Sequence, residues 1–297
     1  MPKSETSDSK MTEISKYDSM TVHIKPGKGW SALNLRDLWK YRELTYFMVW
    51  RDVKVRYKQT LLGISWAIFQ PLLTMIVFTI FFGGLAKIKT DNNIPYPLFN
   101  LAAIIPFTLF TKALNDGSRS LVSHTNMVTK IYFPRLILPI SSVVGGLVDF
   151  GFALLVFVGV MLYYMIAQGF HFIVSWALLG VPLFIILALV TALGVALWLS
   201  ALYVQYRDVG YLLPFLSDFM RIVSPVAFAT SLVPVKWVAL YAVNPMVGVI
   251  DGFRWALLGA PAPNTVGLAV SIVVSLLMLI SGLYYFRRME RTFADTI

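Results

Sequence analysis

The sequence predicts an all-α, polytopic membrane protein with six transmembrane helices. Of its 297 residues 58% are hydrophobic and only 13% are charged, about half the charged fraction of an ordinary soluble domain. The charges are also segregated, with apolar runs of about 20 residues or more between them. A hydrocarbon core about 30 Å thick needs roughly 20 apolar residues per helix, so each run is long enough to cross a bilayer.

The chain begins with a polar tail, residues 1–30, which lacks the apolar core of a secretory signal peptide. Residues 31–60 are expected to form an amphipathic helix, because apolar and aromatic residues recur there at spacings of three and four, with Lys and Arg on a polar face. A basic helix that carries Trp and Tyr lies in the headgroup layer of the membrane. The alternative is a solvated helix beside the membrane. The remaining chain, 61–297, is predicted to be the transmembrane domain.

Six apolar segments of this domain are predicted to span the membrane. The first contains Gln70-Pro71, and a proline at that position is expected to bend it. A short polar loop follows the first span, and a longer one, 115–135, separates the second from the third. The predicted spans are 61–85, 98–114, 136–166, 172–203, 209–223 and 266–286.

The segment before the last span, 224–258, is apolar but interrupted by prolines and glycines. It also carries Lys236, Asp251 and Arg254. Irregular backbone at membrane depth is tolerated only where protein or water covers it. We therefore expect short re-entrant or membrane-surface helices here.

The distribution of basic residues predicts the orientation. Twenty of the 25 Lys and Arg residues lie in the N-terminal segment, the second loop, the turn at Arg207 and the C-terminus. Four lie on the other side, and Arg221 lies within a span. Cytoplasmic loops carry the excess of Lys and Arg, so both termini are predicted to be cytoplasmic. The net charge of +10 is explained by topology and attraction to anionic membrane lipid, not by binding to nucleic acid.

The sequence lacks the residues or motifs that several kinds of functional site require. The absence of cysteine excludes disulfides, cysteine-type zinc sites and thiol nucleophiles. No phosphate-binding GxxxxGK[ST] loop occurs, so any ATPase, with its ATP and Mg²⁺, is expected on a separate subunit. The three histidines lack metal-type spacing, and no carboxylate pair suits glycan chemistry. We expect no cofactor, no metal and no catalytic residue in this chain.

Five polar residues inside the apolar regions need partners, because a lone charge in lipid is costly. Two Asp-Arg pairs are spaced three residues apart, which places each pair on one helix face. Both pairs are read as structural ion pairs, with channel or gate contacts as the alternative. The lone aspartate is expected to bond to a neighbouring helix, with a proton-relay role as the alternative. The residues are Asp149, Asp218, Arg221, Asp251 and Arg254.

Aromatic residues run through the first predicted span. One interpretation is core packing or contact with lipid. The other is the lining of a channel in which rings stack on sugar faces through weak, repeated contacts. The candidate lining residues are Trp66, Phe69, Phe78, Phe81 and Phe82.

Three motifs in register resemble a known family. They are RDVKVRYKQTLLGISWAIFQPLLTM at 51–75, HTNMVTKIYFPR at 124–135 and NPMVGVIDGFRWALLG at 244–259. Together they are similar to the permeases of type-2 ABC exporters, in the polysaccharide and polyol-phosphate branch. The resemblance extends from about residue 35 to residue 291 and leaves out the polar tail.

This resemblance implies a homodimer in a bacterial inner membrane that binds two copies of a separate ATPase and exports a polymer linked to undecaprenyl diphosphate. O-antigen is the leading substrate, with capsular polysaccharide and teichoic acid beside it. Four basic residues are candidates for the headgroup contact, with a role in topology alone as the alternative: Arg51, Lys54, Arg56 and Lys58. By position, the coupling contact with the ATPase would involve Ser123, His124, Asn126, Lys130, Phe133 and Arg135.

Three other functions fit the sequence less well. The same scaffold could export a small lipid or a drug, which would need a smaller, closed cavity. A membrane-embedded glycan enzyme would need a carboxylate pair or a large outer loop, and neither is present. A secondary transporter would need midplane sites for a coupling ion, usually with internal repeats.

Overall fold

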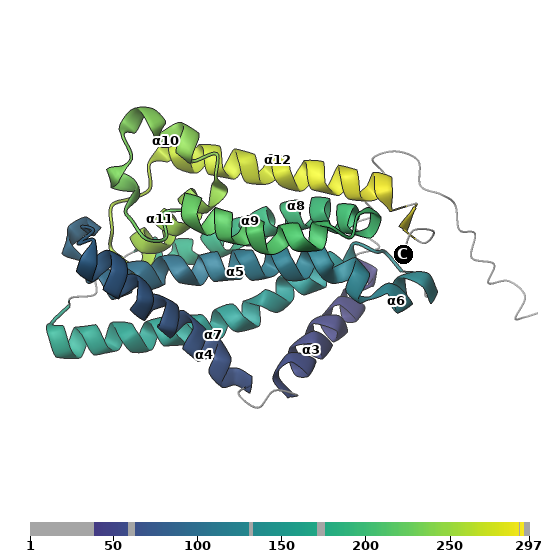
Figure 1. Cartoon of the computed structure of the whole chain (residues 1–297), viewed down its shortest axis with the longest axis horizontal. Coiled ribbons are helices and arrows are strands. Elements are labelled where there is room, and N and C mark those ends of the chain that lie inside the picture. The colour runs from purple at the N-terminus through teal and green to yellow at the C-terminus, as the bar shows by residue number, and fades with distance from the viewer. Residues whose placement is uncertain (1–38, 59–62, 131–132, 171–175, 291, 294–297) are drawn as a thin grey trace, which may run out of the picture. The chain divides into compact units, whose positions relative to one another are not determined.

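The computed structural model describes residues 39–58, 63–130, 133–170, 176–290 and 292–293, all within one compact unit (Figure 1). Every regular element in these ranges is a helix, which confirms the all-α membrane fold. The predicted polar tail and the first part of the predicted amphipathic helix lie outside the described residues.

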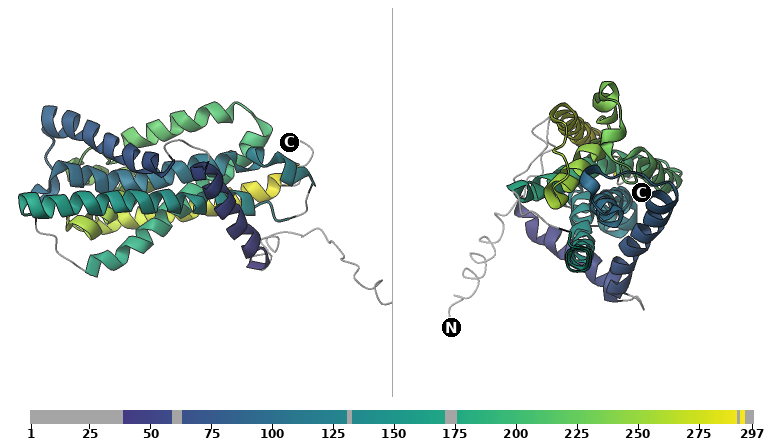
Figure 2. Two further views of the ribbon diagram at one scale, coloured as in Figure 1. Left: turned by 90° about the horizontal axis from the view of Figure 1, so that it is seen from below. Right: turned by 90° about the vertical axis from the view of Figure 1, so that its left-hand side faces the viewer.

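α5 (Tyr96–Ser123) is the central helix, and 19 of its 28 residues are buried. It packs against α7 (Ile137–Gln168) on one side and α8 (Val181–Gln205) on the other, and α12 (Thr265–Met289) packs against α8. The end-on view in Figure 2 shows α5 surrounded by the other helices. Since α5 is apolar and buried over most of its length, it forms the core to which the other spans attach.

α8 and α12 lie unusually close together because small residues line their contact. A Cβ atom at Gly194 would lie only 2.7 Å from the backbone nitrogen of Leu279. Nearer one end, the ring of Trp198 stacks on Tyr285 with 4.1 Å between the centroids. Backbone approach and ring stacking fix the two helices against each other, so we expect them to move as one body.

α4 (Gly63–Phe78) is followed directly by a π-helix (Thr79–Leu85) and runs along the outside of the bundle (Figures 1 and 2). Almost none of the residues in its apolar stretch are buried. Its described surface is therefore available to lipid or to another chain.

Five of the six predicted spans correspond to helices long and apolar enough to cross a membrane. The remaining one, α9 (Val209–Val223), has the predicted bounds and 15 residues. At 1.5 Å per residue it is only about 22 Å long, shorter than the hydrocarbon core. The count of six spans therefore stays a prediction.

The second span ends later than predicted. α5 continues nine residues past Leu114, into the segment predicted to be a loop. The extension is polar on one side, and its Asp116 forms an ion pair with α3 (Arg42–Lys58). Polarity marks where a helix leaves the hydrocarbon, but it does not end the helix.

The segment before α12 forms short helices, as the prolines and glycines predict. These are a 3-10 turn (Thr230–Leu232), α10 (Val235–Tyr241) and α11 (Pro245–Leu258). The side chain of Asn244 caps α11 by accepting a hydrogen bond from the Met246 amide at 3.1 Å. α11 packs on α5, α8 and α12, so this irregular stretch is covered by protein.

Candidate functional site

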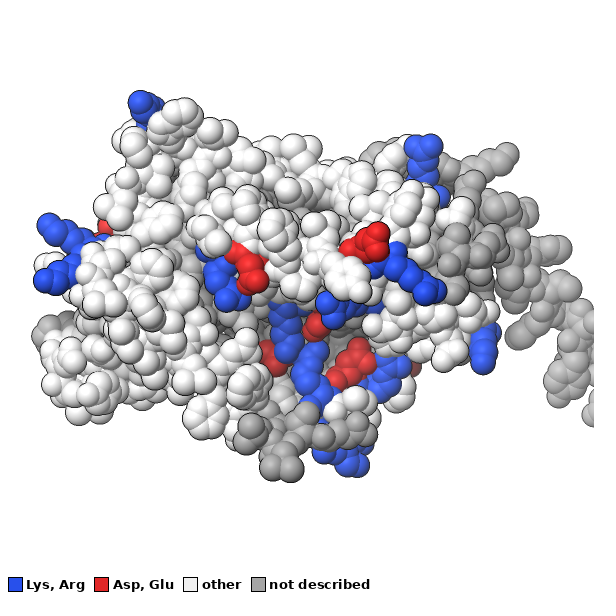
Figure 3. Space-filling view, viewed as in Figure 1, with Lys and Arg blue, Asp and Glu red and all other residues white. Residues whose placement is uncertain are grey.

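Charged contacts gather where α3 lies against α5 and α7, near α6 (Thr125–Lys130). We call this end of the bundle the α6 end and the opposite end the α10 end. Figure 3 shows basic and acidic side chains side by side in the middle of the face seen in Figure 1. Their contacts join helices that are far apart in the sequence.

The first group of contacts, the α3 charge cluster, consists of Arg56, Tyr57, Lys112, Asp116 and Asp149. Asp149 of α7 accepts bonds from Arg56 and Lys112, each at 2.7 Å, and from the Tyr57 hydroxyl. Arg56 also pairs with Asp116 at 2.9 Å. Burial raises the pKa of Tyr57, so its hydroxyl stays protonated and acts as a donor. Two cations and two carboxylates from three helices therefore balance each other, which makes their burial cheaper.

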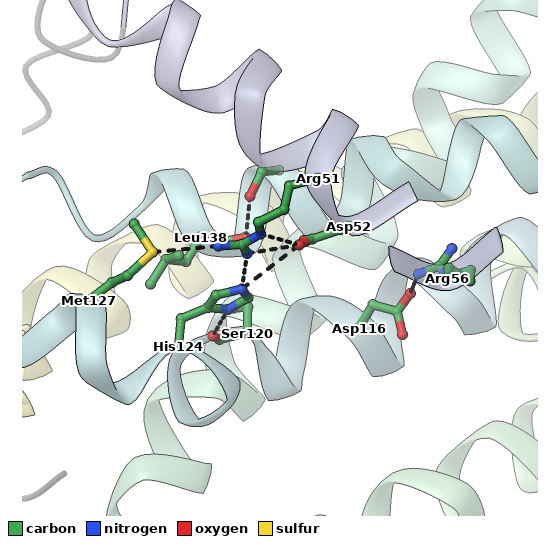
Figure 4. A network of polar contacts seen from close by, with 9 residues as sticks. Arg51, Asp52, Arg56, Asp116, Ser120, His124, Met127 and Leu138 are labelled. Atoms are coloured by element: carbon green, nitrogen blue, oxygen red, sulfur yellow. Dashed lines mark hydrogen bonds and ion pairs between the residues drawn. The ribbon is translucent and has the colours of Figure 1, made fainter. Parts of the chain in front are cut away.

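The second group joins α3 to the start of α6 (Figure 4). The Arg51 guanidinium pairs with Asp52 at 2.8 Å and also contacts Nε2 of His124. His124 Nδ1 lies 2.8 Å from the backbone carbonyl of Ser120, which only accepts, so Nδ1 carries the proton. Nε2 is then the atom that faces the Arg51 guanidinium. The contact between Arg51 and His124 thus connects α3 to the turn before α6.

The third group lies on the other flank of α6. The backbone N–H of Arg135 donates to a carboxylate oxygen of Glu290 at 3.3 Å, and its guanidinium donates to the Glu290 backbone carbonyl. The other Glu290 oxygen accepts from Arg287 at 2.7 Å. The Arg135 guanidinium also lies 5.9 Å from the ring of Phe293. Arg135 is thereby held by the end of α12.

The predicted coupling residues separate into two sets. Ser123, Asn126 and Lys130 are exposed. His124 is partly buried, whereas the side chains of Phe133 and Arg135 turn into the bundle. The exposed set is the most accessible to a partner, and His124 and Arg135 are partly exposed.

The four predicted headgroup residues separate in the same way. Lys54 and Lys58 are exposed, and the Lys54 ammonium lies 4.2 Å from the ring of Trp50. Arg51 and Arg56 are engaged with carboxylates.

This arrangement corrects the expected amphipathic pattern of α3. Arg56 turns inward to Asp116 and Asp149, and Arg51 contacts Asp52 and His124. Tyr46, Phe47 and Trp50 are exposed. The outward side of α3 therefore carries rings and lysines together, a composition that suits the headgroup layer.

At the α10 end, Arg254 is almost fully buried. Its guanidinium donates to three backbone carbonyls, those of Phe99 at 3.3 Å, Phe228 at 3.1 Å and Val226 at 3.2 Å. It also stacks over the Phe99 ring at 3.6 Å. Burial lowers the pKa of Arg254 to about 10, so it stays charged at neutral pH. One side chain thereby ties α11 to α5 and to the turn after α9.

Neither predicted Asp-Arg pair forms an ion pair in the described part of the chain. Asp251 accepts from Thr230 at 2.8 Å and borders a cavity of about 220 Å³. Burial raises its pKa to about 6. Arg221 lies 5.9 Å from the ring of Phe107 instead of contacting Asp218. Spacing of three residues allows a pair, but the Arg254 guanidinium instead satisfies backbone carbonyls of α5 and of the turn after α9, which have to be hydrogen-bonded where they are buried.

The aromatic residues predicted to line a channel also differ in their surroundings. Trp66, Phe69 and Phe81 are exposed by 55%, 52% and 57%. Phe78 packs toward the core and lies 5.2 Å from Phe82, centroid to centroid.

Comparison with known proteins decides the family. Residues 43–258, well over half of the chain, match a family model described as ABC-2 type transporter. The chain belongs to this family. It is therefore a transport permease and not an enzyme: a multi-pass inner-membrane subunit of an ABC transporter, which has an ATPase partner.

Named relatives of this permease cover most of its length. It is 26% identical over 266 residues to the O-antigen export system permease protein RfbA of Myxococcus xanthus, covering 89% of this chain and 98% of that protein. It is 22% identical over 248 residues to the polysialic acid transport protein KpsM of Escherichia coli, covering 81% and 91%. It is 24% identical over 222 residues to the inner membrane transport permease YadH of Escherichia coli K12, covering 70% and 83%.

Sequence reasoning missed three contact residues of the permease: Tyr57, Lys112 and Glu290. Lys112 and Asp116 are four residues apart, a spacing that indicates one helix face once α5 is known to continue past Leu114. Glu290 had no such signal, because its partner Arg135 is 155 residues away. The matched family region ends before α12, so it does not include Glu290.

Proposed function

We propose that this permease is the channel-forming subunit of an exporter that moves lipid-linked polysaccharide from the cytoplasmic to the outer side of the inner membrane, with O-antigen as the leading cargo. The observation that carries this proposal is the large share of the chain that its named relatives match. Two relatives matched over at least four fifths of this chain are named for O-antigen export and polysialic acid transport, and both cargoes are polysaccharides. Teichoic acid, a small lipid or a drug on the same scaffold is the second candidate, since YadH is named only as a permease.

The proposed orientation places the α6 end and both termini in the cytoplasm. The excess of Lys and Arg on that side supports it. Two copies of the ATPase would then dock on α6, where Ser123, Asn126 and Lys130 are exposed. ATP and Mg²⁺ would bind to those subunits.

A homodimer is proposed because a single chain has too few helices to enclose a wide lumen within a dry wall. Two copies that meet face to face can form a shared passage. The uncovered surface of α4 supports a contact of this kind. Its exposed rings, Trp66, Phe69 and Phe81, are the candidates for contact with sugar faces.

The headgroup of the cargo is proposed to meet α3 at Lys54 and Lys58. Both lysines are exposed on the same side of the helix, one turn apart, and Trp50 lies one turn before Lys54. An undecaprenyl-linked substrate carries a diphosphate at this depth of the membrane, and each basic residue near such a surface contributes about 1 kcal/mol. Arg51 and Arg56 would instead hold α3 in place.

Replacing Lys54 and Lys58 together with glutamine is expected to raise the polymer concentration needed for half-maximal export by roughly thirtyfold, because about 2 kcal/mol of attraction is lost. This concentration is measured by following polymer transport into inverted membrane vesicles. The matched control is Lys87→Gln with Lys89→Gln, two lysines with exposed side chains outside the α6 end. If the two double variants need the same polymer concentration for half-maximal export, the α3 lysines have a role in topology alone.

The proposed function as a whole is tested in a host strain from which the gene is deleted. We expect lipid-linked polysaccharide to accumulate inside the cells and surface polysaccharide to disappear, and wild-type protein to reverse both. Lys130→Glu is expected to remain folded but to lose the ATPase in co-purification and to leave surface polysaccharide absent. Arg288→Glu, an exposed cation near the end of α12, is the matched control.

Surface polysaccharide that persists after deletion would reject polysaccharide as the cargo. Normal co-purification of the ATPase with Lys130→Glu would reject only the docking residue. The two outcomes are measured separately, by antibody labelling of intact cells and by affinity purification.

A further inference from the structure

α6 is six residues long, and contacts fasten both of its flanks to other helices. Before α6, His124 contacts Arg51 of α3. After α6, Arg135 contacts Glu290 at the end of α12. In the second contact Arg135 lies within the matched family region and Glu290 lies beyond it, and the function proposed above makes no use of this contact.

We call this second contact the Glu290 clasp, formed by Arg135, Phe286, Arg287, Glu290 and Phe293. Glu290 accepts three hydrogen bonds. One carboxylate oxygen accepts from Arg287, and the other carboxylate oxygen and the backbone carbonyl accept from Arg135. Phe286 and Phe293 are fully buried beneath it and meet edge to face, 5.3 Å apart. Charge-assisted bonds over a packed aromatic pair make a stiff joint.

The chain itself links α6 only to α5 and α7. The clasp adds α12, whose last residues are tied directly to the segment that leaves α6. From there the connection continues into α8, through the close backbone contact at Gly194 and the stacked rings of Trp198 and Tyr285. A displacement of α6 therefore has a mechanical route into two further membrane-spanning helices.

We propose that Glu290 is a positioning residue that transmits displacement of α6 to the α8–α12 pair when the ATPase subunits close. The inference rests on the proposed docking of the ATPase on α6. In this mechanism one movement at the ATPase shifts four spans together, because α5 and α7 follow through the chain while α8 and α12 follow through the clasp. A clasp that only stabilised the end of α12 would affect folding and leave the coupling unchanged.

The test variant is Glu290→Gln, which keeps the size but removes the charge and leaves one side-chain acceptor oxygen for two donors, the Arg135 N–H and Arg287. We expect it to fold, bind the ATPase and hydrolyse ATP, while polymer exported per ATP falls about fivefold or more. Asp208→Asn is the matched control, since this carboxylate is exposed near the end of α8 and its loss changes the charge equally. Wild-type export per ATP in Glu290→Gln would overturn the proposal.

A distance measurement separates transmission from simple stabilisation. The sequence has no native cysteine, so spin labels attach only to cysteines that are introduced. We choose Thr129→Cys and Arg288→Cys, both at exposed positions. We expect the distance between the labels to stay constant when the wild-type complex is trapped with ATP, and to change on trapping in Glu290→Gln. A constant distance in both proteins, or a change in both, would overturn the proposal.

The two proposals fail in different ways. If wild-type permease does not bind the ATPase through α6, the docking proposal fails before Glu290 is tested. If docking holds and Glu290→Gln exports normally, the clasp inference alone fails.

Discussion

Arg254→Leu is expected to destabilise the permease more than any other single change considered for this chain. The guanidinium is buried and satisfies the backbone carbonyls of Phe99, Val226 and Phe228. Leucine would leave these three acceptors without their donor, and each unsatisfied buried group costs about 1–3 kcal/mol. We expect a loss of about 3 kcal/mol or more, read as a large fall in the midpoint of heat-induced aggregation in detergent.

The matched control is Lys236→Leu, which removes an exposed cation from neighbouring α10. Its midpoint should stay near that of the wild type. Arg254→Lys should lie between, because an ammonium keeps the charge but cannot reach three acceptors with the planar fork of a guanidinium. A wild-type midpoint for Arg254→Leu would mean that the carbonyls find other donors.

Asp149→Asn is expected to have the second largest effect, at the opposite end of the bundle. Asp149 accepts from both Arg56 and Lys112, so its loss changes the α3 charge cluster from neutral to +1. Breaking a fully buried pair costs about 3–5 kcal/mol, and partial exposure reduces this to about 2 kcal/mol. We expect α3 to separate from α7, measured as faster maleimide labelling of a cysteine placed at Val53, on the partly buried side of α3.

Asp218→Asn is the control, since this exposed carboxylate of α9 carries the same charge and has no ion pair among the described contacts. The double variant Asp149→Asn with Lys112→Met restores neutrality and should recover part of the protection at Val53. Equal labelling rates in Asp149→Asn and the wild type would show that packing alone holds α3.

The fold could be predicted from the sequence because the bilayer imposes a length and a composition on every span. α9 begins and ends at the predicted residues, and the prolines after it predict the short helices. The end of α5 could not be predicted in this way, because Asp116 is accommodated by Arg56 from another helix. Apolarity indicates where a helix meets lipid and gives no information about where it ends in water.

The site was less predictable, because which charges meet depends on the packing of distant helices. The residue types of α3 indicated an interfacial helix, but not that Arg51 and Arg56 turn inward while Lys54 and Lys58 stay exposed. Likewise, local sequence gave no indication that Arg135 would contact Glu290, and its contact with the ATPase stays a prediction. Local spacing even favoured the wrong partner for Arg254.

The uneven attachment of the helices has a consequence for how the passage can admit cargo from the side. α5 is enclosed by its own chain, so displacing it relative to the helices around it would cost the free energy of a whole core. Among the described residues, the main contacts of α4 with other helices are with α3, α5 and α7, and little of its apolar stretch is buried. It is therefore the helix that is easiest to move, and in the homodimer proposed above the neighbouring copy or the bilayer itself would have to keep the passage closed against the lipid.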